Sequence, residues 1–156
     1  MAAPKVGSKV KAFRAASTSG GDFSLAEAPG KALVLYFYPR DMTSGCSVEA
    51  RDFRDCHDLM KRSGAIVLGV SRDSLKSHDK FRDKESLPFQ LLSDPDEKLC
   101  RLFDVIREKS LYGRKFLGIE RSTFLIDGHG VLRREWRKVK VAGHAQEVLD
   151  AVRALG

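Results

Sequence analysis

Residues 31–38 read KALVLYFY, an almost uninterrupted apolar run that stops at Pro39. A run of this kind is typical of a strand that is buried on both faces of a sheet. A short polar turn follows, and apolar residues then recur at three- and four-residue spacing through residues 44–62, which predicts an amphipathic helix. A strand covered on both faces and leading into a helix indicates a layered α/β fold.

The rest of the chain continues this alternation of strands and helices. We expect strands at residues 65–70, 89–92, 122–127 and 131–138, the last two forming a hairpin, and helices at residues 74–85, from about 93–97 onward, and 143–155. Asp73 or Ser74 is expected to cap the first of these helices, and Ser93 or Asp94 the second. Short irregular or hairpin strands are expected before about residue 28. The prediction is an α/β fold with a mixed central sheet, flanked by helices on both faces.

Length and composition restrict the class of protein further. At roughly 150 residues per domain, the 156 residues predict a single domain over 1–156. Hydrophobic residues at 42% and charged residues at 31% exclude a disordered chain. No apolar run approaches the roughly 18 residues of a membrane span, and the first residues lack the apolar block of a secretory signal. Three cysteines do not suggest a disulfide scaffold, so we expect a reducing, cytoplasmic location and no membrane partner.

Most of the net charge of +7 lies in residues 107–140, where ten basic and four acidic side chains give +6. The simpler interpretation is a solvated basic surface, and the alternative is steering of an anionic substrate or partner. This segment lacks interleaved aromatic residues for base stacking and the spacing of a helix-turn-helix or a zinc finger. We therefore expect no nucleic-acid partner.

Cys46 is the strongest candidate for chemistry. It falls in the first turn of the helix predicted at residues 44–62, where free backbone N–H groups and the helix dipole favour a thiolate. Cys56 lies on the apolar stripe of the same helix, and Cys100 lies among apolar neighbours. We interpret both of these as small hydrophobic core residues.

The string PRDMTSGC, which ends at Cys46, has the form P-x-x-x-T-x-x-C. With YFYP before it, Glu49 after it, and the later segments GVSRD, LLSD and ERSTFLID, the sequence resembles the peroxiredoxins. The resemblance is greatest to the bacterioferritin-comigratory, or Q-type, branch. It spans most of the chain in family order, and it implies a thioredoxin-like fold and reduction of peroxides by a cysteine.

The resemblance also implies a role for each matching residue. Cys46 is the expected peroxidatic nucleophile, which forms a sulfenic acid. Thr43 is expected to direct its hydroxyl at the sulfur and the peroxide, Arg121 to supply a positive charge, and Pro39 to shield the pocket from water. Taken singly, Thr43 is explained equally well as a residue that caps a helix, and Pro39 as a residue that ends a strand. Glu49 could orient an arginine or be an exposed helix carboxylate, and we do not count it among the predicted site residues.

The sequence departs from the family at the second cysteine. The branch resolves its sulfenic acid with a cysteine at one of two positions, which are Arg51 and Arg82 here. We therefore expect a one-cysteine mechanism with an external thiol as reductant: thioredoxin, glutaredoxin, glutathione or a lipoyl group. Cys56 is a poor resolving partner, and Cys100 could act only after local unfolding. The resemblance implies no metal and no organic cofactor, and we expect a monomer.

Other chemistries have less support. The sequence has no C-x-x-C dithiol, and none of its four histidines lies in a recognisable catalytic setting or at zinc-ligand spacing. The alternative function is a thioredoxin-fold binding or chaperone-like protein without turnover. Consumption of peroxide in the presence of a dithiol would distinguish the two.

Overall fold

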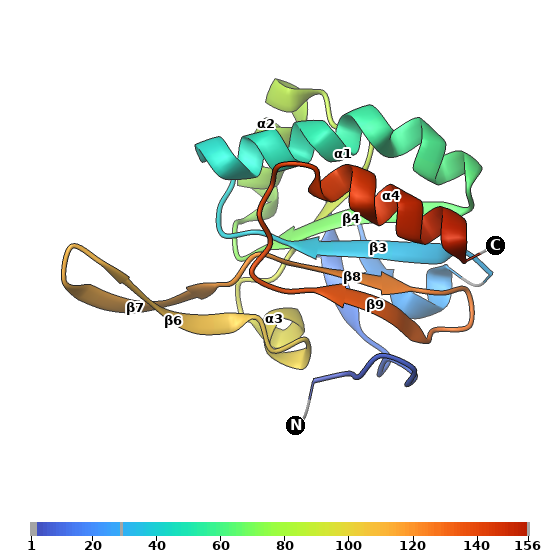
Figure 1. Cartoon of the computed structure of the whole chain (residues 1–156). Coiled ribbons are helices and arrows are strands. Elements are labelled where there is room, and N and C mark those ends of the chain that lie inside the picture. Colours follow the sequence, from blue (N-terminus) through green and yellow to red (C-terminus); the bar gives the residue numbers. More distant parts are fainter. Residues whose placement is uncertain (1–2, 29, 156) are drawn as a thin grey trace.

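The computed structural model describes residues 3–28 and 30–155, and a mixed sheet lies at its centre (Figure 1). The strand order is β2-β1-β5-β4-β3-β8-β9, with β3, β4 and β5 parallel and β8 antiparallel to β3. The strands are β1 (Arg14–Ser17), β2 (Asp22–Ser24), β3 (Ala32–Phe37), β4 (Ala65–Ser71), β5 (Gln90–Ser93), β8 (Ser122–Ile126) and β9 (Leu132–Trp136). The expected mixed sheet is confirmed, including the short strands near the start of the chain.

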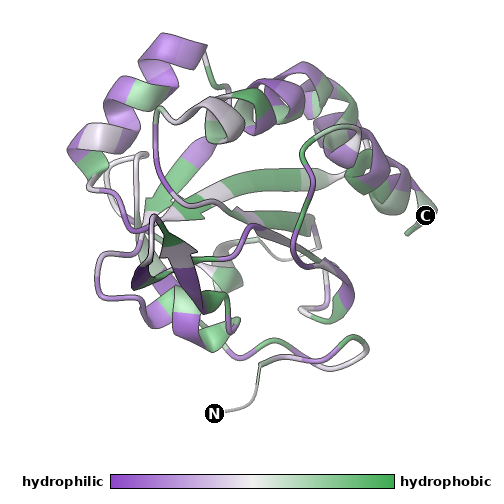
Figure 2. Ribbon diagram, turned by 60° about the vertical axis from the view of Figure 1, so that its left-hand side comes forward, coloured by the Kyte–Doolittle hydropathy of each residue, from purple (hydrophilic) through white to green (hydrophobic). Residues whose placement is uncertain are grey.

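Helices cover both faces of this sheet. Helices α1 (Ser44–Arg62), α2 (Leu75–Glu85) and α4 (His144–Ala154) pack on one face, and the short α3 (Lys98–Leu102) packs on the other (Figure 1). A single 3-10 turn, η1 (Leu25–Glu27), precedes β3. Figure 2 shows the hydrophobic residues concentrated on the central strands and the hydrophilic residues on the outer sides of the helices. Among the described residues, no helix is long and apolar enough to cross a membrane.

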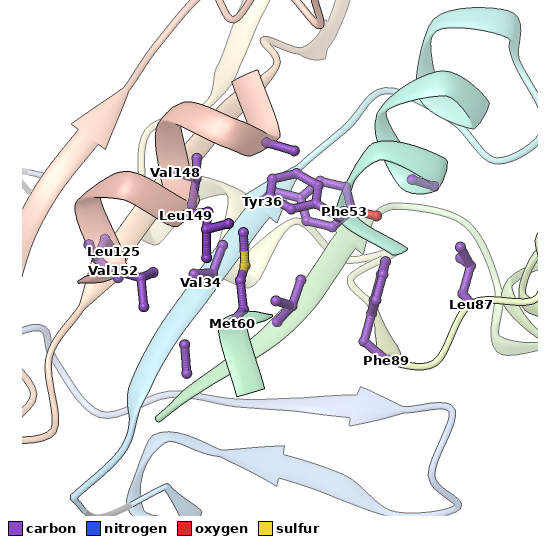
Figure 3. Packing of buried hydrophobic residues seen from close by; sticks show 14 of the residues in the cluster. Val34, Tyr36, Phe53, Met60, Leu87, Phe89, Leu125, Val148, Leu149 and Val152 are labelled. Atoms are coloured by element: carbon purple, nitrogen blue, oxygen red, sulfur yellow. The ribbon is translucent and has the colours of Figure 1, made fainter. Parts of the chain in front are cut away.

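Strand β3 is buried on both faces, as its apolar run predicts, and its alternate side chains enter two separate cores. Val34 and Tyr36 point toward α1 and α4, where Tyr36 stacks on Phe53 with ring centroids 4.6 Å apart (Figure 3). Leu33 and Phe37 point toward the opposite core. The carboxyl end of β3, from which the chain enters α1, is therefore fixed from both sides.

The third helix differs from its predicted start. It begins at Lys98, because Pro95 lies in a turn and Glu97 takes a left-handed φ of 61° just before the helix. Asp94 still acts as a cap from further upstream: its carboxylate accepts hydrogen bonds from the backbone nitrogens of Leu99 (3.1 Å) and Cys100 (2.8 Å). The predicted helix boundary was wrong and the N-cap is Glu97, but Asp94, one of the two expected capping residues, does bond the N–H groups at the start of the helix.

A second hairpin was missed by the sequence analysis. Strands β6 (Ile106–Leu111) and β7 (Arg114–Ile119) pair only with each other and project from the body of the protein (Figure 1). Their two-residue turn is formed by Tyr112 and Gly113, both at positive φ. Most of the side chains of this hairpin face solvent, so the strands lack the apolar alternation by which a half-buried strand is recognised.

Candidate active site

Cys46 lies in the first turn of α1, directly after the loop that leaves β3. Cys46 is buried, with only 2% of its surface exposed to solvent. Thr43 occupies the N-cap position, but its hydroxyl donates to the Arg40 carbonyl (3.0 Å) and makes no cap hydrogen bond. The first intrahelical bond runs from the Ser47 nitrogen to the Thr43 carbonyl (2.8 Å). The N–H groups of the first turn therefore remain available to donate to an anion beside the sulfur.

Arg121 is brought to this sulfur by the pairing of β3 with β8. The register places Phe37 opposite Ser122, so the residue before β8 lies beside the start of α1. The Arg121 Nη2 donates to the Cys46 Sγ at 3.4 Å. A Cβ at Gly45 would lie 3.3 Å from this same Nη2, so a larger residue there would press on the guanidinium. The structure thus brings together two of the predicted residues that are 75 positions apart in the sequence.

Glu49 fixes the other arm of Arg121. Its Oε1 accepts from Nη1 at 2.6 Å, and the residue is 1% exposed. Burial raises the pKa of Glu49 to about 7, although the arginine acts to lower it. Within the described part of the chain, Oε2 has no hydrogen-bond partner. The structure decides between the two interpretations of Glu49: it orients an arginine, and its place three residues after Cys46, on the same helical face, is the signal that indicates this role.

Pro39 and Thr43 lie at the two ends of the loop between β3 and α1. Pro39 is half-buried, and Tyr38 just before it donates its backbone nitrogen to the Val70 carbonyl (3.0 Å). Thr43 is exposed, and its hydroxyl is directed at Arg40 and not at the Cys46 sulfur. Both residues flank the sulfur in sequence, and their roles toward a peroxide remain predictions.

Lys109 adds a second positive charge near the sulfur, and the sequence analysis did not single it out. It extends from β6, and its ammonium group donates to the Ile119 carbonyl, two residues before Arg121. Burial and the neighbouring Arg121 lower the pKa of Lys109, while the charge of Cys46 acts in the opposite direction. The projecting hairpin thus contributes a cation to the surroundings of Cys46.

The other two cysteines lie in settings that disfavour a thiolate, and all three cysteines are free. Burial and the acidic neighbours Asp52 and Asp55 raise the pKa of Cys56. Cys100 is fully buried, and burial together with Asp94 raises the pKa of its thiol far above the usual value. Cys46 belongs to the core on the α1 side of the sheet, and Cys100 belongs to the core on the opposite side.

The two arginines at the expected resolving positions are both held by specific contacts. Arg51 forms an ion pair with Glu85 at the end of α2 (3.1 Å). Arg82 donates its Nε to the Phe89 carbonyl (2.9 Å) and thereby fastens the loop after α2. These contacts tie α1, α2 and the following loop together at the places where a second cysteine would act.

One cluster has the composition of a metal site. Ligand atoms of Asp41, Asp73 and His78 lie within 4.8 Å of one another. Each of these atoms already takes part in hydrogen bonds: Asp41 accepts from Ser77 (2.8 Å), Asp73 accepts from Ser71 (2.5 Å), and the His78 Nε2 bonds the carbonyl of residue 92 (2.9 Å). The cluster is therefore a hydrogen-bonded network.

Comparison with known proteins agrees with this geometry. Residues 6–135 match the model of the AhpC/TSA family. Peroxiredoxin Bcp of Xanthomonas campestris is 54% identical over 139 residues, which cover 88% of this chain and 87% of that protein.

Solved structures of similar proteins point to the same family. The bacterioferritin comigratory protein of X. campestris, studied for its alkyl peroxide reduction, superimposes with a TM-score of 0.87 at 50% identity and covers 92% of this chain and 91% of its own. A cysteine-to-serine variant of Xylella fastidiosa PrxQ gives a TM-score of 0.93 at 41% identity and covers 99% of both chains. The thioredoxin-like fold is thereby confirmed. The chain belongs to the AhpC/TSA family, in the bacterioferritin-comigratory (Q-type) peroxiredoxin branch.

Proposed function

We propose that this protein is a thiol-dependent peroxidase that reduces hydrogen peroxide and small organic hydroperoxides, with Cys46 as its nucleophile. The observation that carries the proposal is the contact of 3.4 Å between Arg121 Nη2 and the Cys46 sulfur at the start of α1. A cation and a set of free backbone donors converge there on one thiol. Membership of the peroxiredoxin branch supports the same chemistry.

In the first step, the Cys46 thiolate attacks one oxygen of the peroxide. An S–O bond forms and the O–O bond breaks, so that sulfur loses two electrons and the peroxide gains them. The departing alkoxide or hydroxide takes a proton and leaves as an alcohol or water. Arg121, held at Nη1 by Glu49 (2.6 Å), stabilises both the initial thiolate and the charge on the departing oxygen.

Pro39 and Thr43 complete the proposed site. The Pro39 ring has no N–H to compete for the sulfur and shields it from water. Thr43 directs its hydroxyl at the bound peroxide, which requires it to exchange its hydrogen bond with the Arg40 carbonyl for one with substrate.

In the second step, an external thiol reduces the sulfenic acid. One thiol forms a mixed disulfide with Cys46 and releases water, and a second thiol frees the Cys46 thiol. Cys56 lies ten residues further along α1, or about 15 Å along its axis, whereas a disulfide requires Cα atoms within about 7 Å. Cys100 is separated from Cys46 by the central sheet. These separations support a one-cysteine cycle with an external thiol. We further propose thioredoxin, glutaredoxin, glutathione or a lipoyl group as that reductant, and a monomer in a reducing, cytoplasmic compartment.

The direct test is consumption of hydrogen peroxide with dithiothreitol as reductant, for the wild-type protein and for Cys46→Ser. We expect turnover by the wild type and none by Cys46→Ser. A wild-type protein that binds peptides or partners without consuming peroxide would instead support the alternative of a thioredoxin-fold binding protein.

A further inference from the structure

The loop that carries Pro39 and Thr43 is anchored by the buried carboxylate of Asp41, which is 6% exposed. The Tyr38 hydroxyl donates to Oδ1 (2.6 Å), and the Ser77 hydroxyl donates to Oδ2 (2.8 Å). The backbone nitrogen of Asp41 donates in turn to Asp73 Oδ2 (2.9 Å). The loop is therefore bonded to Tyr38 directly after β3, to the segment after β4 and to α2.

His78 of α2 completes this anchor. It is fully buried, with Nδ1 2.8 Å from Asp41 Oδ2 and Nε2 2.9 Å from the Leu92 carbonyl. A carbonyl oxygen can only accept, so Nε2 carries a proton. Nδ1 lies within hydrogen-bond distance of a carboxylate oxygen. The Asp41–His78 pair is therefore a short polar contact between two buried side chains.

The other titratable groups around the imidazole are few. Tyr38, directly after β3, lies 3.4 Å from Nδ1. A carboxylate oxygen of Asp73 lies within 4.8 Å of the pair, and Asp73 also accepts from the Asp41 backbone nitrogen. The contact from β5 is the uncharged Leu92 carbonyl.

The backbone beside Asp41 shows why an anchor matters there. Met42 adopts a φ of 63°, a left-handed conformation that is uncommon for a residue with a side chain. The chain turns in this way between the buried Asp41 and Thr43, the N-cap of α1. The position of Asp41 therefore sets the path by which Thr43 and the first turn approach the Cys46 sulfur.

We propose that Asp41 and His78 form a positioning pair for peroxide reduction: their hydrogen bond holds the Pro39–Thr43 loop against α2 and keeps the peroxide site around Cys46 in its reactive geometry. This inference rests on the proposed peroxidase function. The pair does not touch the peroxide. It acts by fixing the loop.

The test compares variants that break the pair with one that preserves its shape. His78→Gln and Asp41→Ala should lower the second-order rate constant for hydrogen peroxide about 10-fold or more, since small displacements of reacting groups are costly. Asp41→Asn should stay close to the wild-type rate, because its amide can donate to the His78 Nδ1. His57→Gln, at a half-buried histidine on the far part of α1, is the matched control and should leave the rate unchanged.

Alkylation of Cys46 by iodoacetamide supplies a second readout, because this reaction needs the thiolate but no peroxide site. His78→Gln should slow the peroxide reaction far more than alkylation, and circular dichroism should show an unchanged fold. A His78→Gln protein with the wild-type peroxide rate, or an Asp41→Asn protein as slow as Asp41→Ala, would overturn the inference. Failure of the proposed function is distinguishable, because the wild-type protein itself would then not consume peroxide.

Discussion

Replacement of Arg121 by methionine removes the one side-chain cation that contacts the Cys46 sulfur. Two unit charges 3.4 Å apart interact by about 5 kcal/mol at an effective dielectric constant of about 20, which is an upper bound for a site that solvent reaches in part. Loss of one preorganised donor at a reacting centre typically costs about 10²- to 10³-fold in rate. We therefore expect Arg121→Met to slow oxidation of Cys46 by at least about 10²-fold, because the reacting sulfur and the departing oxygen lose this donor.

A companion variant separates this effect from a loss of stability. Without Arg121, the pKa of the buried Glu49 rises further, and its protonated carboxyl group loses its hydrogen-bond partner, a loss that typically costs about 1–3 kcal/mol. Arg121→Met combined with Glu49→Gln removes the orphaned carboxyl group. The double variant should recover much of the free energy of unfolding while the rate stays low.

The assay is stopped-flow competition for hydrogen peroxide against a peroxidase of known rate, with urea unfolding measured in parallel. Arg133→Met, at an arginine paired with Asp127 on the surface, is the matched control and should react like the wild type. An Arg121→Met protein with an unchanged rate would refute the role given to this contact. So would recovery of the rate in the double variant, because instability would then explain the loss.

Three further predictions concern the cysteines and the acid stability of the protein. Cys46→Ser should abolish reaction with peroxide, whereas Cys56→Ser and Cys100→Ser should keep the first turnover in a single-turnover assay; retained reaction by Cys46→Ser would contradict the assignment. Because no resolving thiol is near, excess peroxide should over-oxidise Cys46 to the sulfinic acid, which intact mass measurement would detect as a gain of two oxygens; complete resistance would contradict the one-cysteine cycle. Burial lowers the pKa of His144, whose Nε2 lies 2.7 Å from the Thr123 hydroxyl, from 6.5 to about 4. As the pH falls, this histidine is therefore protonated in the unfolded chain before it is protonated in the folded protein. The free energy of unfolding should fall by up to about 3 kcal/mol as the pH drops from 6.5 to 4. An equal loss of stability in acid by His144→Gln would exclude this histidine as its cause.

The central strand and the helix that carries Cys46 were predictable because their burial follows directly from local patterns. The apolar run of residues 31–38 and the periodicity of residues 44–62 correspond to β3 (Ala32–Phe37) and α1 (Ser44–Arg62). The β6–β7 hairpin was not predictable in the same way, because its side chains face solvent and carry no periodic apolar signal.

The site was predictable only where the family motif supplied it. Spacing alone would not bring Arg121 to Cys46, since the contact depends on the register between β3 and β8. Asp41 and His78 were missed for the same reason: they are 37 residues apart and meet only when α2 packs beside the loop after β3. Glu49 could have been found from its helical spacing to Cys46, but its burial depends on the fold.

The central claim is that peroxide oxidises Cys46 and that no cysteine within the chain resolves it. The most direct measurement is non-reducing mass spectrometry of the wild-type protein after one equivalent of hydrogen peroxide, in the presence of a trap for sulfenic acid. We predict a single trapped adduct on the peptide that contains Cys46, with Cys56 and Cys100 unmodified. A stoichiometric disulfide between Cys46 and either of these cysteines, or an adduct on a different cysteine, would contradict the account.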